Sequence, residues 1–277
     1  MGTGVQTCAL PILIEGHAEF IDNHTVRVVQ LTGEVELSGE KIFINTGAQS
    51  TIPNVEGLTT TPGVFDSTGL LNLTQRPERL GILGGGYIGV EFASMFANFG
   101  SKVTIYEAAP QFLPREDRDI ADTIANILRD QGVELILNAN VQSVSSHDGA
   151  VQLHMPEGTQ TVDVLLVASG RKPATENLQL QNAGVDVNDR GAIIVNKYLR
   201  TSADNIWAMG DVTGGLQFTY ISLDDFRIVR DNLLGEGVRN TGDRQNVPYS
   251  VFMTPPLSRV GMTEEQARAS GAAVQVD

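Results

Sequence analysis

The clearest hydrophobic pattern lies between residues 79 and 137, where short apolar runs alternate with longer segments of helical periodicity. The run at 79–83 stops at three glycines, which predicts a buried strand followed by a tight turn. Apolar side chains then recur as on one face of a helix, at Ile88, Phe92, Met95, Phe96 and Phe99. Gly100 predicts the end of this helix, because glycine readily adopts the left-handed conformation that follows helix C-termini.

The same order of strand and helix then repeats. Residues 102–106 predict a second strand that ends at Glu107, and residues 133–137 predict a third. Between them a helix is predicted from about Asp117 to Gly132, with an apolar stripe at Ile120, Ile124, Ile127 and Leu128. The order β-α-β-α-β implies a parallel sheet with right-handed crossovers, and therefore a Rossmann-like α/β fold.

The flanking regions show shorter patterns. Strands are predicted at 18–21, 25–29, 41–44, 141–144, 151–155, 163–168, 205–209 and 249–252. A helix is predicted from about Ser222 to Leu234, and another after Thr263, where Thr-Glu-Glu is typical of a helix start. The region from Pro53 to Pro62 is predicted to be a connector.

The composition is that of a globular protein, with 277 residues of which 41% are hydrophobic and 19% charged. A formal charge of −14 argues against nucleic acid or an anionic membrane as the main partner. No apolar run is long enough to span a membrane, and the N-terminal apolar run lacks the basic flank of a secretory signal. We therefore expect a cytoplasmic protein.

The cysteine and histidine residues of this sequence indicate neither a disulfide nor a metal site. Cys8 is the single cysteine, so no internal disulfide can form. The four histidines show no metal-ligand spacing with one another or with Cys8. His147 precedes the hairpin signal Asp148-Gly149, and His154 is expected on the outer face of a strand. We expect no metal site.

Gly84, Gly86 and Gly89 form a G-x-G-x-x-G motif in the context that a dinucleotide requires, directly after a buried strand and opening a helix. Gly84 permits the tight turn, Gly86 leaves room for a pyrophosphate, and Gly89 lets helix and strand pack closely. The helix N-terminus supplies N–H donors to the phosphates. The alternative is a glycine-rich turn without a ligand.

Glu107 indicates which dinucleotide is bound. It lies 23 residues after Gly84, at the end of the second predicted strand, where a carboxylate accepts hydrogen bonds from the adenosine ribose. Such a carboxylate repels a 2′-phosphate, and the next three residues include no arginine to receive one. The sequence therefore predicts NADH in preference to NADPH.

Several ordered motifs together resemble the flavoprotein disulfide reductase family, which includes dihydrolipoamide dehydrogenase, glutathione reductase and mercuric reductase. The motifs are Ile44-Asn45-Thr46-Gly47 with Pro53, residues 84–91, residues 168–173, residues 207–211 and residues 260–264. Within the family, the sequence of this chain is similar to those of bacterial flavoproteins of reactive-chlorine resistance, which are proposed to reduce cupric ions. The resemblance covers residue 13 to the end.

This resemblance implies that one set of residues holds NAD(H): Gly84, Gly85, Gly86, Tyr87, Ile88, Gly89, Glu91, Glu107, Val141 and Gly170. Tyr87 would be the aromatic gate over the flavin, and Glu91 would lie near the flavin–nicotinamide contact and pair with a lysine. The open alternatives are that Tyr87 only packs on the sheet and that Glu91 is a solvated helix charge.

The resemblance also implies FAD. Asp211 would accept hydrogen bonds from the ribityl chain, Thr46 and Gly47 would contact the cofactor, and the Phe218-Thr219 backbone would approach the pyrimidine edge of the flavin. The open alternative for Asp211 is a simple Asx turn after a strand.

The resemblance divides the chain into a Rossmann-like NAD(H)-binding domain inserted in an incomplete FAD-binding domain, plus the start of an α+β dimerisation domain. The expected segments are a foreign leader at 1–12, FAD-binding parts at 13–72 and 171–246, the NAD(H) domain at 73–170, and the truncated dimerisation domain at 247–277.

The family's redox cysteine pair and its histidine–glutamate pair have no counterpart in this sequence, so we expect no catalytic residue in the chain and no activity from it alone. The intact enzyme would be a homodimer that passes hydride from NADH to FAD, then to a cysteine pair and an unidentified acceptor such as a disulfide or a metal ion. The competing hypothesis is a non-catalytic NAD(H)-binding module.

Overall fold

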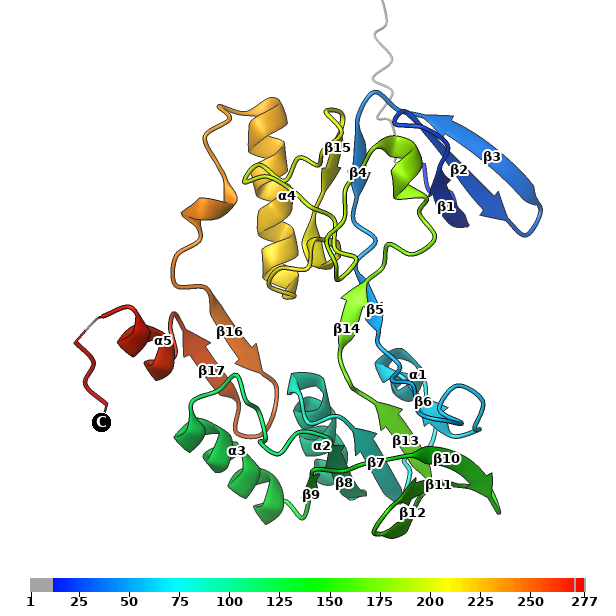
Figure 1. Cartoon of the computed structure of the whole chain (residues 1–277), viewed down its shortest axis with the longest axis vertical. Helices are drawn as coiled ribbons and strands as arrows, with labels where there is room; N and C mark the ends of the chain where they lie inside the picture. The colour runs from blue at the N-terminus through cyan, green and yellow to red at the C-terminus, as the bar shows by residue number, and fades with distance from the viewer. Residues whose placement is uncertain (1–11, 272, 277) are drawn as a thin grey trace, which may run out of the picture. The chain divides into compact units, whose positions relative to one another are not determined.

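The computed structural model describes residues 12–271 and 273–276 (Figure 1). The described residues form two compact units, one of residues 12–48 and 173–243 and the other of residues 49–172, 244–271 and 273–276. The expected foreign leader lies outside the described residues except for Ile12, and so does Cys8. The domain boundaries predicted from the sequence stay predictions.

The second unit is built on a five-stranded parallel sheet in the order β6-β13-β7-β8-β9. Its strands are β6 (Val64–Phe65), β7 (Arg79–Leu83), β8 (Lys102–Glu107), β9 (Glu134–Leu137) and β13 (Val164–Val167). Helices α1 (Ser67–Leu71), α2 (Tyr87–Asn98) and α3 (Arg118–Asp130) connect them. The α/β class and the β-α-β-α-β order predicted for residues 79–137 are confirmed.

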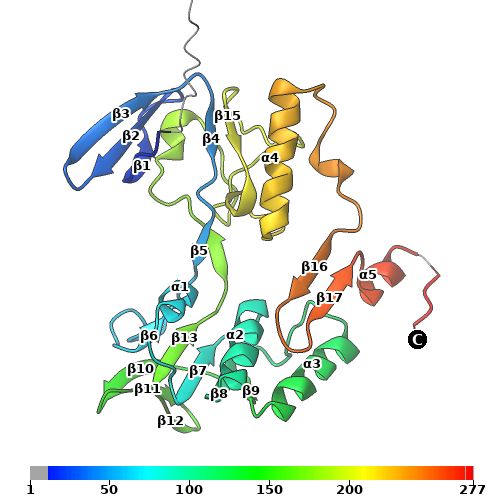
Figure 2. The same cartoon turned by 180° about the vertical axis from the view of Figure 1, so that it is seen from behind.

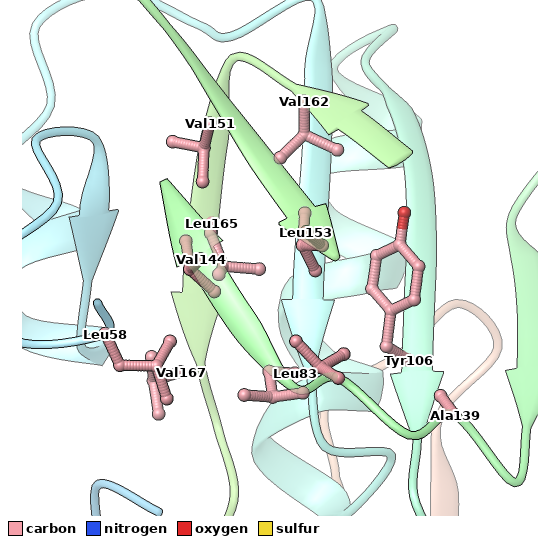
Figure 3. Close-up of a cluster of buried hydrophobic side chains, with 11 residues drawn as sticks. Leu58, Leu83, Tyr106, Ala139, Val144, Val151, Leu153, Val162, Leu165 and Val167 are labelled. Atoms are coloured by element: carbon pink, nitrogen blue, oxygen red, sulfur yellow. The ribbon is translucent and has the colours of Figure 1, made fainter. Parts of the chain in front are cut away.

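A small antiparallel sheet packs on this parallel sheet. It consists of β10 (Ser143–His147), β11 (Ala150–Met155) and β12 (Gly158–Val162). Asp148 and Gly149 form the predicted hairpin turn, both with positive φ, and His147 pairs directly with Ala150. Figure 3 shows the shared core, in which Leu153 of the small sheet lies between Leu165 and Tyr106 of the parallel sheet.

A C-terminal hairpin completes this unit. It consists of β16 (Pro248–Val251) and β17 (Leu257–Val260), followed by α5 (Glu264–Ala269). Figure 2 shows the hairpin beside α2 and α3. Thr263 and Gln266 form a capping box at the start of α5, as the sequence pattern predicted.

The first unit contains shorter elements. An antiparallel sheet is formed by β1 (His17–Phe20), β2 (Thr25–Gln30) and β3 (Gly33–Ser38), and a parallel pair by β4 (Ile42–Ile44) and β15 (Ile206–Ala208). Helix α4 (Thr219–Leu234) runs beside this pair (Figure 1). Strands β5 (Ala48–Ser50) and β14 (Arg171–Pro173) pair where the chain passes between the units. Three 3₁₀ turns lie at Leu180–Ala183, Gly210–Thr213 and Thr241–Asp243.

Two apolar positions of the predicted helical stripes are exposed. Phe99 and Ile120 were placed on apolar stripes, yet they are 60% and 36% exposed. Phe99 lies just beyond the last residue of α2, where the chain turns into Gly100, and Ile120 lies in the first turn of α3. Helix ends are less covered by the sheet than helix centres, so periodicity alone overestimates burial there.

Within the described residues, no helix is both long and apolar enough to cross a bilayer. Over the same residues, no group of three or more His, Cys, Asp or Glu side chains is arranged to hold a metal ion.

Candidate dinucleotide-binding site

A cavity of about 530 Å³ opens in the second unit, where β7, β8 and β13 end. Its size is within the range of small-molecule sites. The residues that line it are Pro53, Val55, Leu83–Tyr87, Tyr106–Ala109, Leu113–Arg115, Ala139–Val141 and Ala168–Gly170. Ligands of open α/β sheets bind at the carboxyl ends of the strands, so this cavity is the candidate site.

The three glycines of the G-x-G-x-x-G motif, which runs from the loop after β7 into α2, are constrained in different ways. A Cβ on Gly84 would lie 2.5 Å from the carbonyl oxygen of Ala168, and φ at Gly84 is +111°. A Cβ on Gly89 would lie 2.1 Å from the carbonyl oxygen of Gly84. Both glycines are therefore required by the fold itself.

Gly86 differs from these two. Its φ of −74° suits any residue, and a Cβ there would meet no atom of the described chain within 4 Å. The residue lines the cavity. Nothing in the described fold requires a glycine at this position, whereas a ligand that approaches the backbone closely does.

The N-terminus of α2 also opens on the cavity. Gly86 is the N-cap residue, Tyr87 is the first helical residue, and both line the cavity. In the described chain no side chain caps this end, and the first turn contains no acidic residue. The N–H groups of the first turn and the positive end of the helix dipole therefore remain available for an anion such as a pyrophosphate.

Glu107 lies at the end of β8 and is held in place through both carboxylate oxygens. Oε2 accepts a hydrogen bond from the Gly85 N–H at 2.6 Å, and Oε1 accepts one from the Ala109 N–H at 2.7 Å. Each carboxylate oxygen has a second lone pair, so the side chain can still accept hydrogen bonds from two hydroxyls of a ribose. This geometry suits the role predicted for Glu107.

Arg115 is a lining residue that was not predicted from the sequence. The chain turns back at Leu113, where φ is +45°, and Arg115 reaches the lining of the same cavity. Arg115 is exposed and can contact a phosphate of a bound nucleotide. No local motif marks this position, because the loop conformation brings it to the site.

Of the other residues predicted to hold NAD(H), some line the cavity and some do not. Val141 and Gly170 line the cavity, and Gly170 has a φ of +124°. Tyr87 lines it as well, and burial followed by a hydrogen bond with Glu116 raises the pKa of its hydroxyl. Ile88 and Glu91 lie further along α2, outside the lining as the described residues define it.

Glu91 has a partner other than the lysine expected from the resemblance. Its Oε1 accepts a hydrogen bond from the N–H of Phe252 at 2.9 Å, which fastens the C-terminal hairpin to α2. The role predicted for Glu91 near a flavin–nicotinamide contact stays a prediction.

The residues predicted to contact FAD lie together in the first unit. Thr46 and Gly47 follow the end of β4, and Asp211 follows the end of its parallel neighbour β15. The two strand ends are joined by a hydrogen bond from the Met209 N–H to the Ile44 carbonyl oxygen at 3.0 Å. Ligands of parallel sheets bind at the carboxyl ends of the strands, so this edge is a candidate cofactor site.

This edge fits a cofactor such as FAD. A Cβ on Gly47, whose φ is +73°, would meet nothing within 4 Å in the described chain, so the backbone there is open to a ligand. Phe218 and Thr219 form the start of α4, where no described side chain caps the helix and no acidic residue occupies the first turn. The hydroxyl of Thr46 donates to the Ala174 carbonyl oxygen at 2.9 Å, so its contact with a cofactor would be through other atoms.

The parallel sheet, the glycine loop and the carboxylate after β8 are the features of the α/β dinucleotide-binding class. A family model described as pyridine nucleotide-disulphide oxidoreductase matches residues 10–225. The chain therefore belongs to the pyridine nucleotide-disulphide oxidoreductases, a family of flavoprotein enzymes, and the resemblance drawn from its motifs is confirmed.

Similar proteins support this conclusion. The chain is 72% identical over 264 residues to the probable pyridine nucleotide-disulfide oxidoreductase RclA of Escherichia coli, covering 95% of this chain and 60% of that protein. It is 36% identical over 263 residues to a mercuric reductase of Staphylococcus aureus, covering 94% and 47%. A solved Cu(II) complex of the HOCl-induced flavoprotein disulfide reductase RclA from Escherichia coli matches with a TM-score of 0.91 and 71% identity, covering 95% and 59%. The chain thus spans between about half and three fifths of the length of these relatives.

Proposed function

We propose that this chain is the NADH-binding and part of the FAD-binding portion of an oxidoreductase of the disulfide reductase type. The observation that supports the proposal is that Gly86 and Glu107 line the same cavity. Gly86 leaves the backbone open for a pyrophosphate, and Glu107 presents fixed carboxylate oxygens for the ribose beside it.

Preference for NADH over NADPH rests on the negative charge of Glu107, which lies where the adenosine ribose would bind. A 2′-phosphate there would face a carboxylate already held by Gly85 and Ala109, and like charges at close range repel. Among the described residues that line the cavity, Arg115 is the one cation, and it is the residue that could offset this repulsion.

FAD, when bound, would supply a two-electron acceptor for the hydride of NADH. The residues of this chain would hold it at the edge formed by the ends of β4 and β15, with Asp211 accepting hydrogen bonds from its hydroxyls and α4 directing its N-terminus to the cofactor. The names of the relatives point to a disulfide or a metal ion as the final acceptor. Delivery to a disulfide needs a cysteine pair, which the single cysteine of this sequence cannot provide.

The second candidate function is a non-catalytic NAD(H)-binding module. It is favoured by one observation, that the described cavity lies within a single unit and every residue lining it falls between Pro53 and Gly170. Such a site can bind a dinucleotide without any contribution from the residues predicted to hold FAD.

Purified chain, mixed with FAD and freed of excess cofactor, distinguishes the two. Bound FAD whose visible absorbance bleaches on addition of NADH supports the oxidoreductase. A colourless protein that binds NADH in isothermal titration calorimetry supports the module, and absence of NADH binding rejects both.

A further inference from the structure

A buried cluster connects the nucleotide cavity to the C-terminal hairpin. At its centre is Glu116, whose side chain is 2% exposed. It accepts hydrogen bonds from the hydroxyls of Tyr87 and Tyr249, the latter at 2.5 Å, and forms an ion pair with Arg259 at 3.2 Å. The guanidinium carbon of Arg259 lies 4.7 Å from the ring centre of Tyr249, so the cation also stacks on an aromatic face.

The four residues of this cluster come from four different segments. Tyr87 is the first residue of α2, and Glu116 lies in the loop before α3. Tyr249 and Arg259 face each other on β16 and β17. The cluster therefore holds a helix, a loop and a hairpin at fixed positions within the second unit.

The chemistry of the cluster favours one fixed arrangement. A buried carboxylate must replace its lost hydration, and here two hydroxyls and a guanidinium do so. Burial, followed by the hydrogen bond with Glu116, raises the pKa of both the Tyr87 and the Tyr249 hydroxyl. Both tyrosines are therefore neutral hydrogen-bond donors at neutral pH.

Tyr87 is the only member of the cluster among the residues that line the described cavity. The other three are not among the described lining residues, so the cluster can act on a ligand there through the position of the Tyr87 ring. Along the chain Tyr87 follows Gly86, whereas Gly85, which contacts Glu107, precedes it. If the adenosine lies at Glu107 and the pyrophosphate at Gly86, the nicotinamide half faces Tyr87.

We propose that Glu116 is a positioning residue that fixes the Tyr87 ring as a preformed wall for the nicotinamide half of the ligand, and so couples hairpin docking to nicotinamide binding. The inference rests on the proposed NADH function and adds to it a residue that does not itself touch the nucleotide. A preformed wall raises affinity because the binding-competent position of the ring is already populated.

The test measures binding of two ligands to the full chain by isothermal titration calorimetry. NADH contains the nicotinamide ring and ADP-ribose lacks it, so a ring-positioning effect should appear with NADH only. The variants are Glu116→Gln, Tyr87→Phe and the double variant, with Glu36→Gln and Tyr198→Phe in the other unit as matched controls.

We expect each single variant to raise the Kd for NADH about ten-fold, the low end for a hydrogen bond to a charged group. The double variant should be no weaker than either single one, because both remove the same interaction. ADP-ribose affinity should stay within about two-fold of wild type in all variants, given that its contacts at Gly86 and Glu107 are kept. Tyr87→Phe keeps the ring and leaves Glu116 with two partners, so it provides the test even if Glu116→Gln does not fold.

Three outcomes overturn the proposal in distinguishable ways. If the wild-type chain binds neither ligand, both the proposed NADH function and the positioning role of Glu116 are rejected. Wild-type chain that binds NADH, with unchanged affinity in Tyr87→Phe and Glu116→Gln, rejects the positioning role alone. Equal losses for NADH and ADP-ribose show that Glu116 merely supports the fold.

Discussion

The backbone N–H of Gly85 donates a 2.6 Å hydrogen bond to Oε2 of Glu107, so the glycine loop after β7 and the carboxylate after β8 form one connected structure. A Cβ on Gly85 would lie 3.1 Å from the same oxygen, closer than most side chains tolerate. The middle glycine of the Gly84-Gly85-Gly86 run is therefore explained by Glu107, a residue 22 positions away along the chain.

The first prediction concerns this carboxylate. Glu107→Ala should weaken NADH binding by about ten-fold or more, because hydrogen bonds to a charged group contribute about 1.5–3 kcal/mol. The loss for NADPH should be smaller, since the repulsion of its 2′-phosphate disappears at the same time. Titration calorimetry with both nucleotides measures the ratio, and Glu157→Ala, in the exposed turn between β11 and β12, is the control. Equal losses for the two nucleotides would contradict the assigned role.

The second prediction compares Gly86, the N-cap of α2, with Gly89 in the first turn of the same helix. Gly89→Ala should destabilise the fold by about 1–3 kcal/mol, because the new Cβ would meet the carbonyl oxygen of Gly84. Gly86→Ala should cost at most about 1 kcal/mol, the difference between glycine and alanine at a helix N-cap. Its effect should instead be a loss of NADH affinity of more than about ten-fold, from blocked approach of the pyrophosphate.

Thermal unfolding and NADH titration of both variants provide the measurement. The expected pattern is a lowered midpoint for Gly89→Ala and a nearly normal midpoint with weak binding for Gly86→Ala. A Gly86→Ala chain that binds NADH as wild type does would show that no ligand approaches the backbone there.

The third prediction concerns Asp163, which accepts hydrogen bonds from the backbone N–H of Arg79 at 2.8 Å and from its Nε at 3.0 Å. Burial acts to raise the pKa of Asp163, but the hydrogen bonds from Arg79 outweigh it, and the pKa lies below its ordinary value of 3.8. Asp163→Asn should therefore lower the free energy of unfolding by about 0.5–1 kcal/mol at neutral pH, a modest figure because the pair is partly exposed.

The pH dependence follows from the lowered pKa. The contribution of Asp163 is fully present above the unfolded-state value and is lost as the pH falls through the lower folded-state value. In denaturant unfolding, the free energies of unfolding of wild type and Asp163→Asn should therefore differ at pH 6 and converge towards pH 3. Glu78→Gln is the control, because Glu78 and Lys102 are 3.9 Å apart and well exposed. A difference that persists unchanged at pH 3 would contradict the prediction.

The fourth prediction concerns Tyr106, which is 1% exposed. Burial, with a smaller effect of the Glu134 carboxylate, raises the pKa of its hydroxyl to about 12. Because the folded-state pKa is raised, the contribution of Tyr106 is fully present below the unfolded value of about 10 and is lost as the pH rises from there to 12. Tyr106→Phe should flatten the fall of the thermal midpoint between about pH 9.5 and 11.

The same variant measured at pH 7.5 is its own control, since ionisation of Tyr106 is negligible there. Parallel midpoint curves for wild type and Tyr106→Phe across the alkaline range would show that the buried hydroxyl does not contribute.

The fold of the second unit was largely predictable because its elements are long and their patterns strong. Strands β7, β8 and β13 and helices α2 and α3 follow the predicted positions closely. Strands β3 and β12 were missed, because Gly33–Ser38 and Gly158–Val162 are mostly exposed and carry few apolar side chains. Their conformation is set by pairing with a neighbouring strand, which a local pattern does not contain.

Part of the cavity lining was predictable, because Gly86 and Glu107 follow the ends of predicted strands. Arg115 was not, because a left-handed residue in the preceding loop brings it to the cavity. The partners of Tyr87 were not predictable either, since Glu116 and Tyr249 lie 29 and 162 residues away from it.

The packing of the C-terminal hairpin on α2 determines which residues are needed to express the nucleotide-binding unit by itself. Tyr249, Val251 and Met253 are each less than 8% exposed, and the hairpin is fastened to α2 by Glu91 and Ser94. An expression clone that stops at residue 172 would uncover the apolar face of α2 and leave Glu116 without two of its partners. A recombinant nucleotide-binding unit should therefore combine two pieces of the gene, with residues 49–172 joined to residues 244–276 through a linker.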